Sequence, residues 1–102
     1  MKKSTIEDNI SQQPPSGNVY QLDSIHAYIF VHTHDGNVLQ ILENAKNLKH
    51  VTSASAVSGD YNIIVKVRVQ TLDQLMKITD KLQLIHGIHQ TATHIIEKEV
   101  FP

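Results

Sequence analysis

Hydrophobic and polar residues alternate along several segments of the chain and recur at helical spacing along two others. Residues 25–32 alternate Ile, Ala, Ile and Val with His, Tyr, Phe and His, which predicts a strand. Residues 61–69 alternate in the same way, with Tyr61 on the face of Ile63 and Asn62 on the opposite face. Residues from 88 to about 100 predict a last strand, in which Thr91 and Thr93 share one face.

Two segments between these strands predict amphipathic helices. The first opens at Asp35 and Gly36 and keeps its apolar stripe to Leu48. The second begins with the capping box of Thr71 and Gln74 and ends near Gly87. Residues 51–57 predict a further strand that turns tightly through residues 58–60 into the strand at 61–69, as a hairpin. The predicted order is βαββαβ.

This order predicts an α+β fold of the ferredoxin-like kind, a four-stranded antiparallel sheet with two helices on one face. The uncovered face would carry Tyr28, Phe30 and Ile64 among Thr, His, Lys and Arg side chains. Apolar patches larger than a few hundred Å² rarely stay exposed on a monomer. We therefore predict that the chain dimerises into an α/β sandwich, or assembles further, through the sheet face or edges.

Composition narrows the possible functions. The 102 residues are 40% hydrophobic and 19% charged, which suits one globular domain, predicted over 25–102 after a flexible Pro- and Gln-containing leader at 1–24. The lack of cysteine excludes disulfides, thiolate metal sites and a Cys nucleophile, and fits a cytoplasmic protein. With a net charge of −1 and scattered Lys and Arg, we expect no direct nucleic-acid binding. No run approaches the roughly 20 apolar residues that a membrane span requires, so we expect no span.

Five segments together carry a resemblance to a known family. They are residues 27–31, residues 57–67 (Val-Ser-Gly-Asp-Tyr-Asn-Ile-Ile-Val-Lys-Val), Ile88 after Gly87, and the strand around residues 91–93, with the helix that opens at Gly36. About three quarters of the chain resembles the effector-binding domain of the Lrp/AsnC, or feast/famine, transcriptional regulators, known as the RAM domain. Its order of elements is shared by many ferredoxin-like domains, so the glycine turn is the more specific part.

The resemblance implies a cytoplasmic, non-enzymatic domain without a cofactor that dimerises through its sheets and assembles into rings, such as octamers or decamers. It implies that an amino acid or related metabolite binds between subunits. Carried over by position, the ligand-binding candidates are Gly59, Asp60, Tyr61, Asn62, Thr91 and Thr93. Asn62 stands where the family usually has Asp, so one charge that could pair with an α-ammonium group is missing.

Full-length family members carry an N-terminal helix-turn-helix, whereas only 24 residues precede the first predicted strand. The resemblance therefore implies a stand-alone effector domain, which senses metabolites itself or co-assembles with a full-length regulator.

The same residues also allow plainer interpretations. Gly59 and Asp60 suit an ordinary two-residue hairpin turn, Thr91 and Thr93 suit any strand, and Tyr61 suits a core or an interface.

Two other functions stay open at this point. A small dimeric α+β barrel enzyme of the monooxygenase-like kind could use His26, His32 or His94 in a cavity on the sheet face. A metal-binding module could use the imidazoles of His32 and His34 with Asp35, joined by His86, His89 and His94. Neither a glycine-rich phosphate loop nor a nucleophile elbow supports the enzyme hypothesis.

Overall fold

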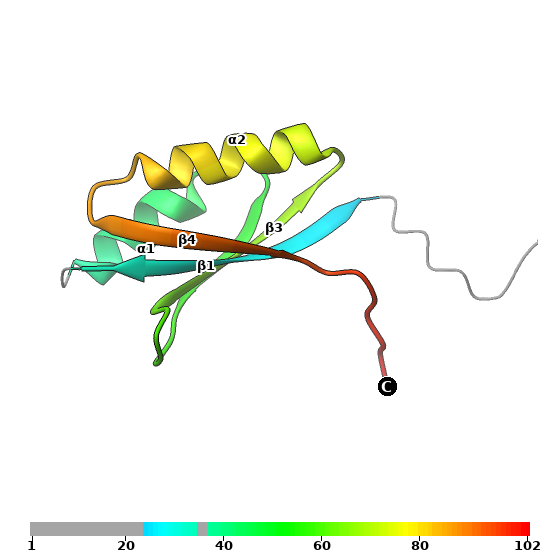
Figure 1. The fold of residues 1–102 in the computed structure, drawn as a ribbon, viewed down its shortest axis with the longest axis horizontal. Coiled ribbons are helices and arrows are strands. Elements are labelled where there is room, and N and C mark those ends of the chain that lie inside the picture. The colour runs from blue at the N-terminus through cyan, green and yellow to red at the C-terminus, as the bar shows by residue number, and fades with distance from the viewer. Residues whose placement is uncertain (1–23, 35–36) are drawn as a thin grey trace, which may run out of the picture.

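Four strands and two helices follow one another in the predicted order in the computed structural model, which describes residues 24–34 and 37–102. Their bounds are β1 Ile25–Thr33, α1 Val38–Lys46, β2 Val51–Ala56, β3 Ile63–Val69, α2 Leu72–Gln83 and β4 Ile88–Ile95. All strand pairs are antiparallel in one sheet of order β2-β3-β1-β4, and both helices lie on one side of it (Figure 1). The ferredoxin-like fold is confirmed. The predicted leader falls almost wholly outside the described residues.

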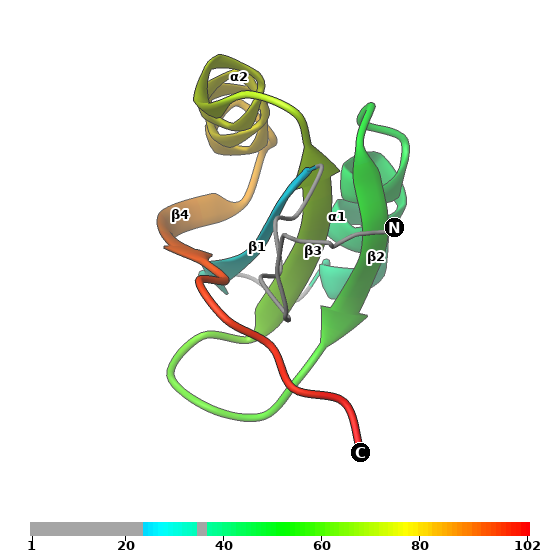
Figure 2. The ribbon, with the colours of Figure 1, turned by 90° about the vertical axis from the view of Figure 1, so that its right-hand side faces the viewer.

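The hydrophobic core lies between the sheet and the two helices. α1 packs on β2 and β3, and α2 packs on β4 and β3, so Figure 2 shows α2 on the β4 side and α1 on the β2 side. Alternate residues of β1 and β3 face the helices, as the sequence pattern predicts. Burial of one such side chain, for example Ile29, contributes roughly 1.5–3 kcal/mol to folding. The buried apolar residues are Ala27, Ile29, Val31, Ile41, Ala45, Ile63, Val65, Val67, Val69, Leu75, Ile78 and Leu82.

The N-terminus of α2 is capped as the sequence predicts, with one difference. The Thr71 hydroxyl accepts a hydrogen bond from the Gln74 backbone N–H at 3.1 Å. The Gln74 side-chain oxygen accepts from the backbone N–H of Gln70 at 2.8 Å, one residue before the donor that a capping box uses. The predicted opening of the first helix at Asp35 and Gly36 lies outside the described residues.

Two strands are shorter than the sequence predicts. β3 begins at Ile63 rather than at residue 61, because the chain from Val57 to Asn62 is a six-residue loop instead of a tight turn. β4 ends at Ile95 rather than near residue 100. Among the described strands it pairs only with β1, which begins at Ile25, and the last bond runs from the Ile96 N–H to the His26 carbonyl at 2.9 Å. No described strand lies beyond that bond to continue the pairing.

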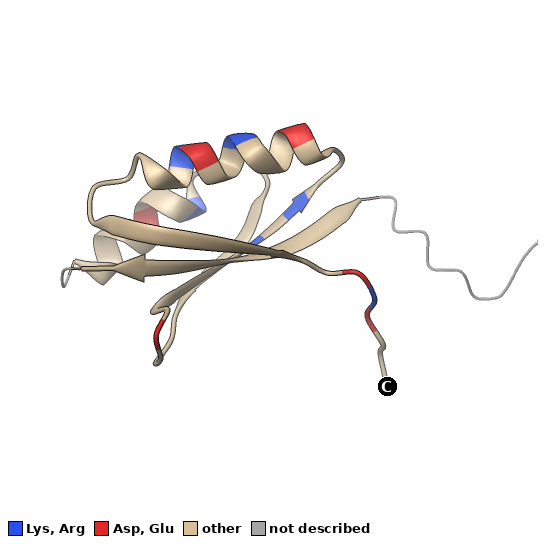
Figure 3. Ribbon diagram, viewed as in Figure 1, with Lys and Arg blue, Asp and Glu red and all other residues tan. Residues whose placement is uncertain are grey.

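The face of the sheet opposite the helices, the open face, carries aromatic and apolar side chains. Phe30 lies at its centre, with ring centroids 6.5 Å from Tyr28 and 4.9 Å from His94. Tyr28, Phe30 and Ile64 are half-buried within this single chain. Figure 3 shows that β1 and β4 carry no Lys, Arg, Asp or Glu, whereas charged residues lie on both helices, β3 and the C-terminal segment. Lys66 and Arg68 of β3 pair with Tyr28 and His26 and also lie on this face, so only its β1–β4 half has the aromatic, uncharged composition typical of interface cores.

Candidate functional site

The loop from Val57 to Asn62 joins the end of β2 to the start of β3, and hydrogen bonds hold both ends of the loop. The Val57 N–H donates to the Asn62 carbonyl at 2.9 Å, which closes the loop. The Asn62 N–H donates to the Val31 carbonyl of β1 at 3.0 Å. Gly59 has φ of +143°, a backbone conformation that residues with a side chain rarely adopt, so glycine suits this position in the loop. The loop is therefore attached to β1 as well as to β2 and β3.

Asn62 forms a reciprocal pair with Thr33 at the end of β1. Its side-chain oxygen accepts from the Thr33 N–H at 3.0 Å, and its amide nitrogen donates to the Thr33 hydroxyl at 2.8 Å. Thr33 is only 5% exposed and lies on the helix-facing side of the sheet. The Asn62 amide is thus turned inward and occupied, on the opposite side from the one that strand alternation predicts.

Tyr61 lies on the open face, where its ring centroid is 6.0 Å from that of Phe30. The prediction that Tyr61 shares the face of Ile63 is therefore wrong. Alternation holds only within a strand, and residues 61 and 62 belong to the loop. Because Asn62 takes the inward position for its bonds to Thr33, Tyr61 is left on the outside.

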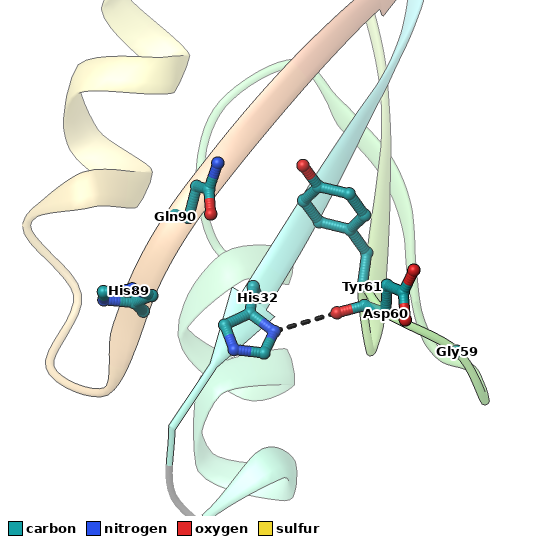
Figure 4. Close-up of a pocket in the computed structure, with 6 residues that line it drawn as sticks. All are labelled: His32, Gly59, Asp60, Tyr61, His89 and Gln90. Atoms are coloured by element: carbon teal, nitrogen blue, oxygen red, sulfur yellow. Dashed lines mark hydrogen bonds between the residues drawn. The ribbon is translucent and has the colours of Figure 1, made fainter.

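A shallow, open cleft of about 610 Å³ lies between this loop and the ends of β1 and β4. Its lining brings three of the predicted residues together with three others, and Figure 4 shows all six: His32, Gly59, Asp60, Tyr61, His89 and Gln90. The His32 ring nitrogen Nδ1 is 2.9 Å from the Asp60 carbonyl oxygen, to which it donates. The Asp60 carboxylate points away from His32 in Figure 4. The cleft thus offers an imidazole, an amide, a phenol and a nearby carboxylate to a small polar molecule.

Thr91 and Thr93 lie elsewhere. They pair with Val31 and Ile29 of β1, and directly opposite residues of antiparallel strands share a face, so both threonines are on the helix side of the sheet. The Thr91 hydroxyl accepts from the Gln83 side-chain amide at 3.1 Å. Within one chain, the structure gathers Gly59, Asp60 and Tyr61 around the cleft but leaves both threonines on the other side.

The other cleft residues follow from the pairing of β1 with β4. His32 is opposite Gln90, and Thr33 is opposite Ile88, so the register shifts by one residue between His32 and Thr33. His89 is the extra residue at this irregularity. Strand alternation places Gln90 on the open face but His89 on the other, and only the register shift brings His89 to the cleft.

The histidines proposed for an enzyme do not form one site. His26 is 3.2 Å from the Ser24 hydroxyl at one end of β1, and His32 is bound to the Asp60 carbonyl near the other end. His94 meets the Phe30 ring edge to face. These three imidazoles are therefore spread along the open face.

Within 24–34 and 37–102, the structure has no helix long and apolar enough to cross a bilayer.

Comparison with known proteins identifies the family. The sequence model described as the Lrp/AsnC ligand binding domain matches residues 26–102. The HTH-type transcriptional regulator FL11 of Pyrococcus abyssi is 23% identical over 108 residues, which cover 96% of this chain and 72% of FL11.

Solved structures agree with this match. The hypothetical protein PHS023 from Pyrococcus horikoshii is 33% identical with a TM-score of 0.65, over 74% of this chain and 92% of that one. The AsnC protein of E. coli is 26% identical with a TM-score of 0.70, over 78% of this chain and 54% of AsnC. The chain therefore belongs to the Lrp/AsnC ligand-binding domain family, and the relatives that it resembles are transcriptional regulators.

Proposed function

We propose that this ligand-binding domain takes up a small amino acid, or a related metabolite, and thereby controls how subunits of a transcriptional regulator assemble. The observation that supports this proposal is the cleft between the 57–62 loop and the ends of β1 and β4, next to an uncovered sheet face. The domain acts in the cytoplasm without catalysis and without a cofactor. Its partners are further copies of this chain or a full-length regulator of the same family.

The chemistry of the cleft suits a zwitterionic ligand. An amino acid needs hydrogen-bond donors for its carboxylate and acceptors for its ammonium group. The exposed Asp60 carboxylate can accept from the ammonium, and the side chains of Gln90 and Tyr61 can donate to the carboxylate. At Gly59, the absence of a side chain allows the ligand to approach the backbone N–H groups of the loop.

A second subunit completes the site in this proposal. The cleft is open to solvent, and Thr91 and Thr93 lie on the helix side of the sheet. A ligand that meets both groups therefore takes the loop residues from one subunit and the threonines from a neighbour. The aromatic centre of the open face supports a homodimer, and contacts between dimers would build the ring of eight or ten subunits.

A thermal-shift screen of the twenty amino acids tests the ligand. A ligand that binds only the folded state stabilises it by about 2.7 kcal/mol at a hundredfold excess over Kd. For a domain of this size that free energy raises Tm by roughly 10–20 °C. We expect the shift to shrink strongly in Asp60→Asn. The matched control Asp80→Asn removes the charge of an exposed carboxylate on α2 and should keep the full shift.

Two results would contradict this assignment. If none of the twenty amino acids raises Tm, then amino-acid sensing is refuted, although the assembly role survives. If an amino acid raises Tm equally in Asp60→Asn and in the control, then binding occurs away from this cleft. Light scattering of the unliganded protein tests the assembly role separately, and the mass of a single chain at micromolar concentration would refute it.

A further inference from the structure

Three histidine rings gather where β1 ends and β4 begins. The ring centroids of His34 and His89 are 3.9 Å apart, those of His32 and His89 are 5.6 Å apart, and those of His32 and His34 are 5.9 Å apart. We call this group the histidine cluster. Two of its members, His32 and His89, also line the cleft, whereas His34 does not.

The fold itself brings the three side chains together. His32 and His34 are two residues apart, at the end of β1 and just beyond it. The His34 N–H donates to the Gly87 carbonyl at 3.4 Å, which holds the residue after β1 against the start of β4. The register shift beside Thr33 then turns His89 toward them. The cluster is thus a product of β1–β4 pairing and depends on residues more than fifty positions apart in the sequence.

The spacing of the rings is close to what a metal ion requires. Three imidazoles that bind one Zn²⁺ tetrahedrally, with Zn–N bonds of about 2.0–2.1 Å, have ring centroids about 5 Å apart. The observed separations lie on both sides of that value. Among the described residues, no group of three or more His, Asp or Glu side chains is already placed to hold a metal ion, so the rings must move for one to bind. His34 and His89 are exposed, so their rings can rotate into place without repacking the core.

One ring is already oriented as a ligand. A carbonyl oxygen can only accept, so the bond between His32 Nδ1 and the Asp60 carbonyl requires the proton on Nδ1. The other nitrogen, Nε2, then carries the free lone pair that a metal needs. Histidine ligands commonly have their second nitrogen fixed by a carbonyl or carboxylate in this way. This hydrogen bond forms without a metal, so the His32 ring loses less conformational entropy when a metal binds.

The local charge also suits a cation. β1 and β4 contain neither Lys nor Arg, and Asp60 adds a carboxylate beside the cleft. We propose that His32, His34 and His89 bind one divalent ion of the first transition series that prefers imidazole, such as Zn²⁺, Ni²⁺ or Cu²⁺. Three protein ligands leave at least one coordination position for water or a small ligand. This proposal does not depend on amino-acid binding.

Isothermal titration of the tag-free, full-length chain with ZnCl₂ tests the site. We expect one Zn²⁺ per chain with a Kd below roughly 100 µM. Loss of a group that only orients a metal ligand through a hydrogen bond costs about tenfold or more in metal affinity, so His34→Ala, which removes a ligand itself, should raise Kd at least about tenfold. The matched control is His50→Asn, which removes an imidazole just before β2, at the opposite end of the sheet from the histidine cluster. Asn tolerates the positive φ of 75° at that position.

A measurement without substitutions gives an independent answer. Of the seven histidines in the chain, the ring protons of His32, His34 and His89 alone should shift in NMR spectra when one equivalent of Zn²⁺ is added. Any one of three results would overturn the proposal: no saturable binding, equal Kd values in the two variants, or fewer than one Zn²⁺ per chain with a rise in mass. The last would show an ion held between chains instead of within one.

Discussion

Replacement of Asn62 by alanine tests whether this side chain is a structural clamp or a free ligand group. The change removes two hydrogen bonds to Thr33, with lengths of 3.0 and 2.8 Å. It also leaves the Thr33 N–H, in a residue only 5% exposed, without its partner. A hydrogen bond contributes about 0.5–1.5 kcal/mol, and an unsatisfied buried group costs about 1–3 kcal/mol. We therefore expect the free energy of unfolding to fall by about 2–3 kcal/mol.

Urea unfolding followed by circular dichroism measures this loss, with the slope m unchanged if only stability changes. Asn44→Ala is the control, because Asn44 is exposed within α1, where alanine is a slightly better helix former. Asn62→Asp should lose less than Asn62→Ala. Its carboxylate still accepts from the Thr33 N–H, and the Thr33 hydroxyl can rotate to donate to it. Surface substitutions usually change the free energy of unfolding by less than about 0.5 kcal/mol. A decrease that small in Asn62→Ala would refute the role of Asn62 as a structural clamp.

Two further predictions concern the turn before β4 and the open face. Gly87 has φ of +98°, and an added Cβ would lie 3.1 Å from Ile41 Cδ1. For both reasons, Gly87→Ala should lower the free energy of unfolding by about 1–2 kcal/mol, measured in the same urea assay. A wild-type midpoint would show that the turn relaxes. Phe30→Glu places a charge at the centre of the open face, and light scattering should show the mass of a single chain, with the folded circular dichroism spectrum retained. An unchanged oligomer would show that assembly uses another surface.

Sequence patterns predicted those parts of this fold that depend on regular elements. The alternation of β1 and β3 identified the buried face because one side of each strand packs on the helices. Helical spacing found both helices for the same reason, and Thr71 marked the start of α2 through a local hydrogen bond. These signals arise within a few residues of chain, so they can be read without knowing the tertiary structure.

The site depends on contacts between distant segments, which local patterns do not contain. Extending the alternation of β3 back to Tyr61 gave the wrong face, because the inward position belongs to Asn62 through its bonds to Thr33. His89 was missed as a cleft residue because the register shift between β1 and β4 decides its side. Gly59 was correctly placed in the connection between β2 and β3, since a positive φ favours glycine, although that connection is a longer loop than the predicted tight turn.

The end of β1 holds the cleft loop through three consecutive residues. The Val31 carbonyl accepts from the Asn62 N–H, His32 donates to the Asp60 carbonyl, and Thr33 pairs with the Asn62 side chain. Because neighbouring strand residues point to opposite faces, His32 holds the loop from the open face while Thr33 holds it from the helix side.

A loop fixed on both sides of the sheet loses little conformational freedom when a ligand binds, which lowers the cost of binding. These contacts use the backbone carbonyl of Asp60, whereas its carboxylate points away from His32. In the proposed site, two tasks are therefore divided along the loop. Asn62 and the Asp60 backbone give rigidity, and the Asp60 side chain and Tyr61 are proposed to meet a ligand or a neighbouring subunit. On this reasoning, Asn62→Ala should weaken effector binding through a looser loop, whereas Asp60→Asn should weaken it with stability unchanged.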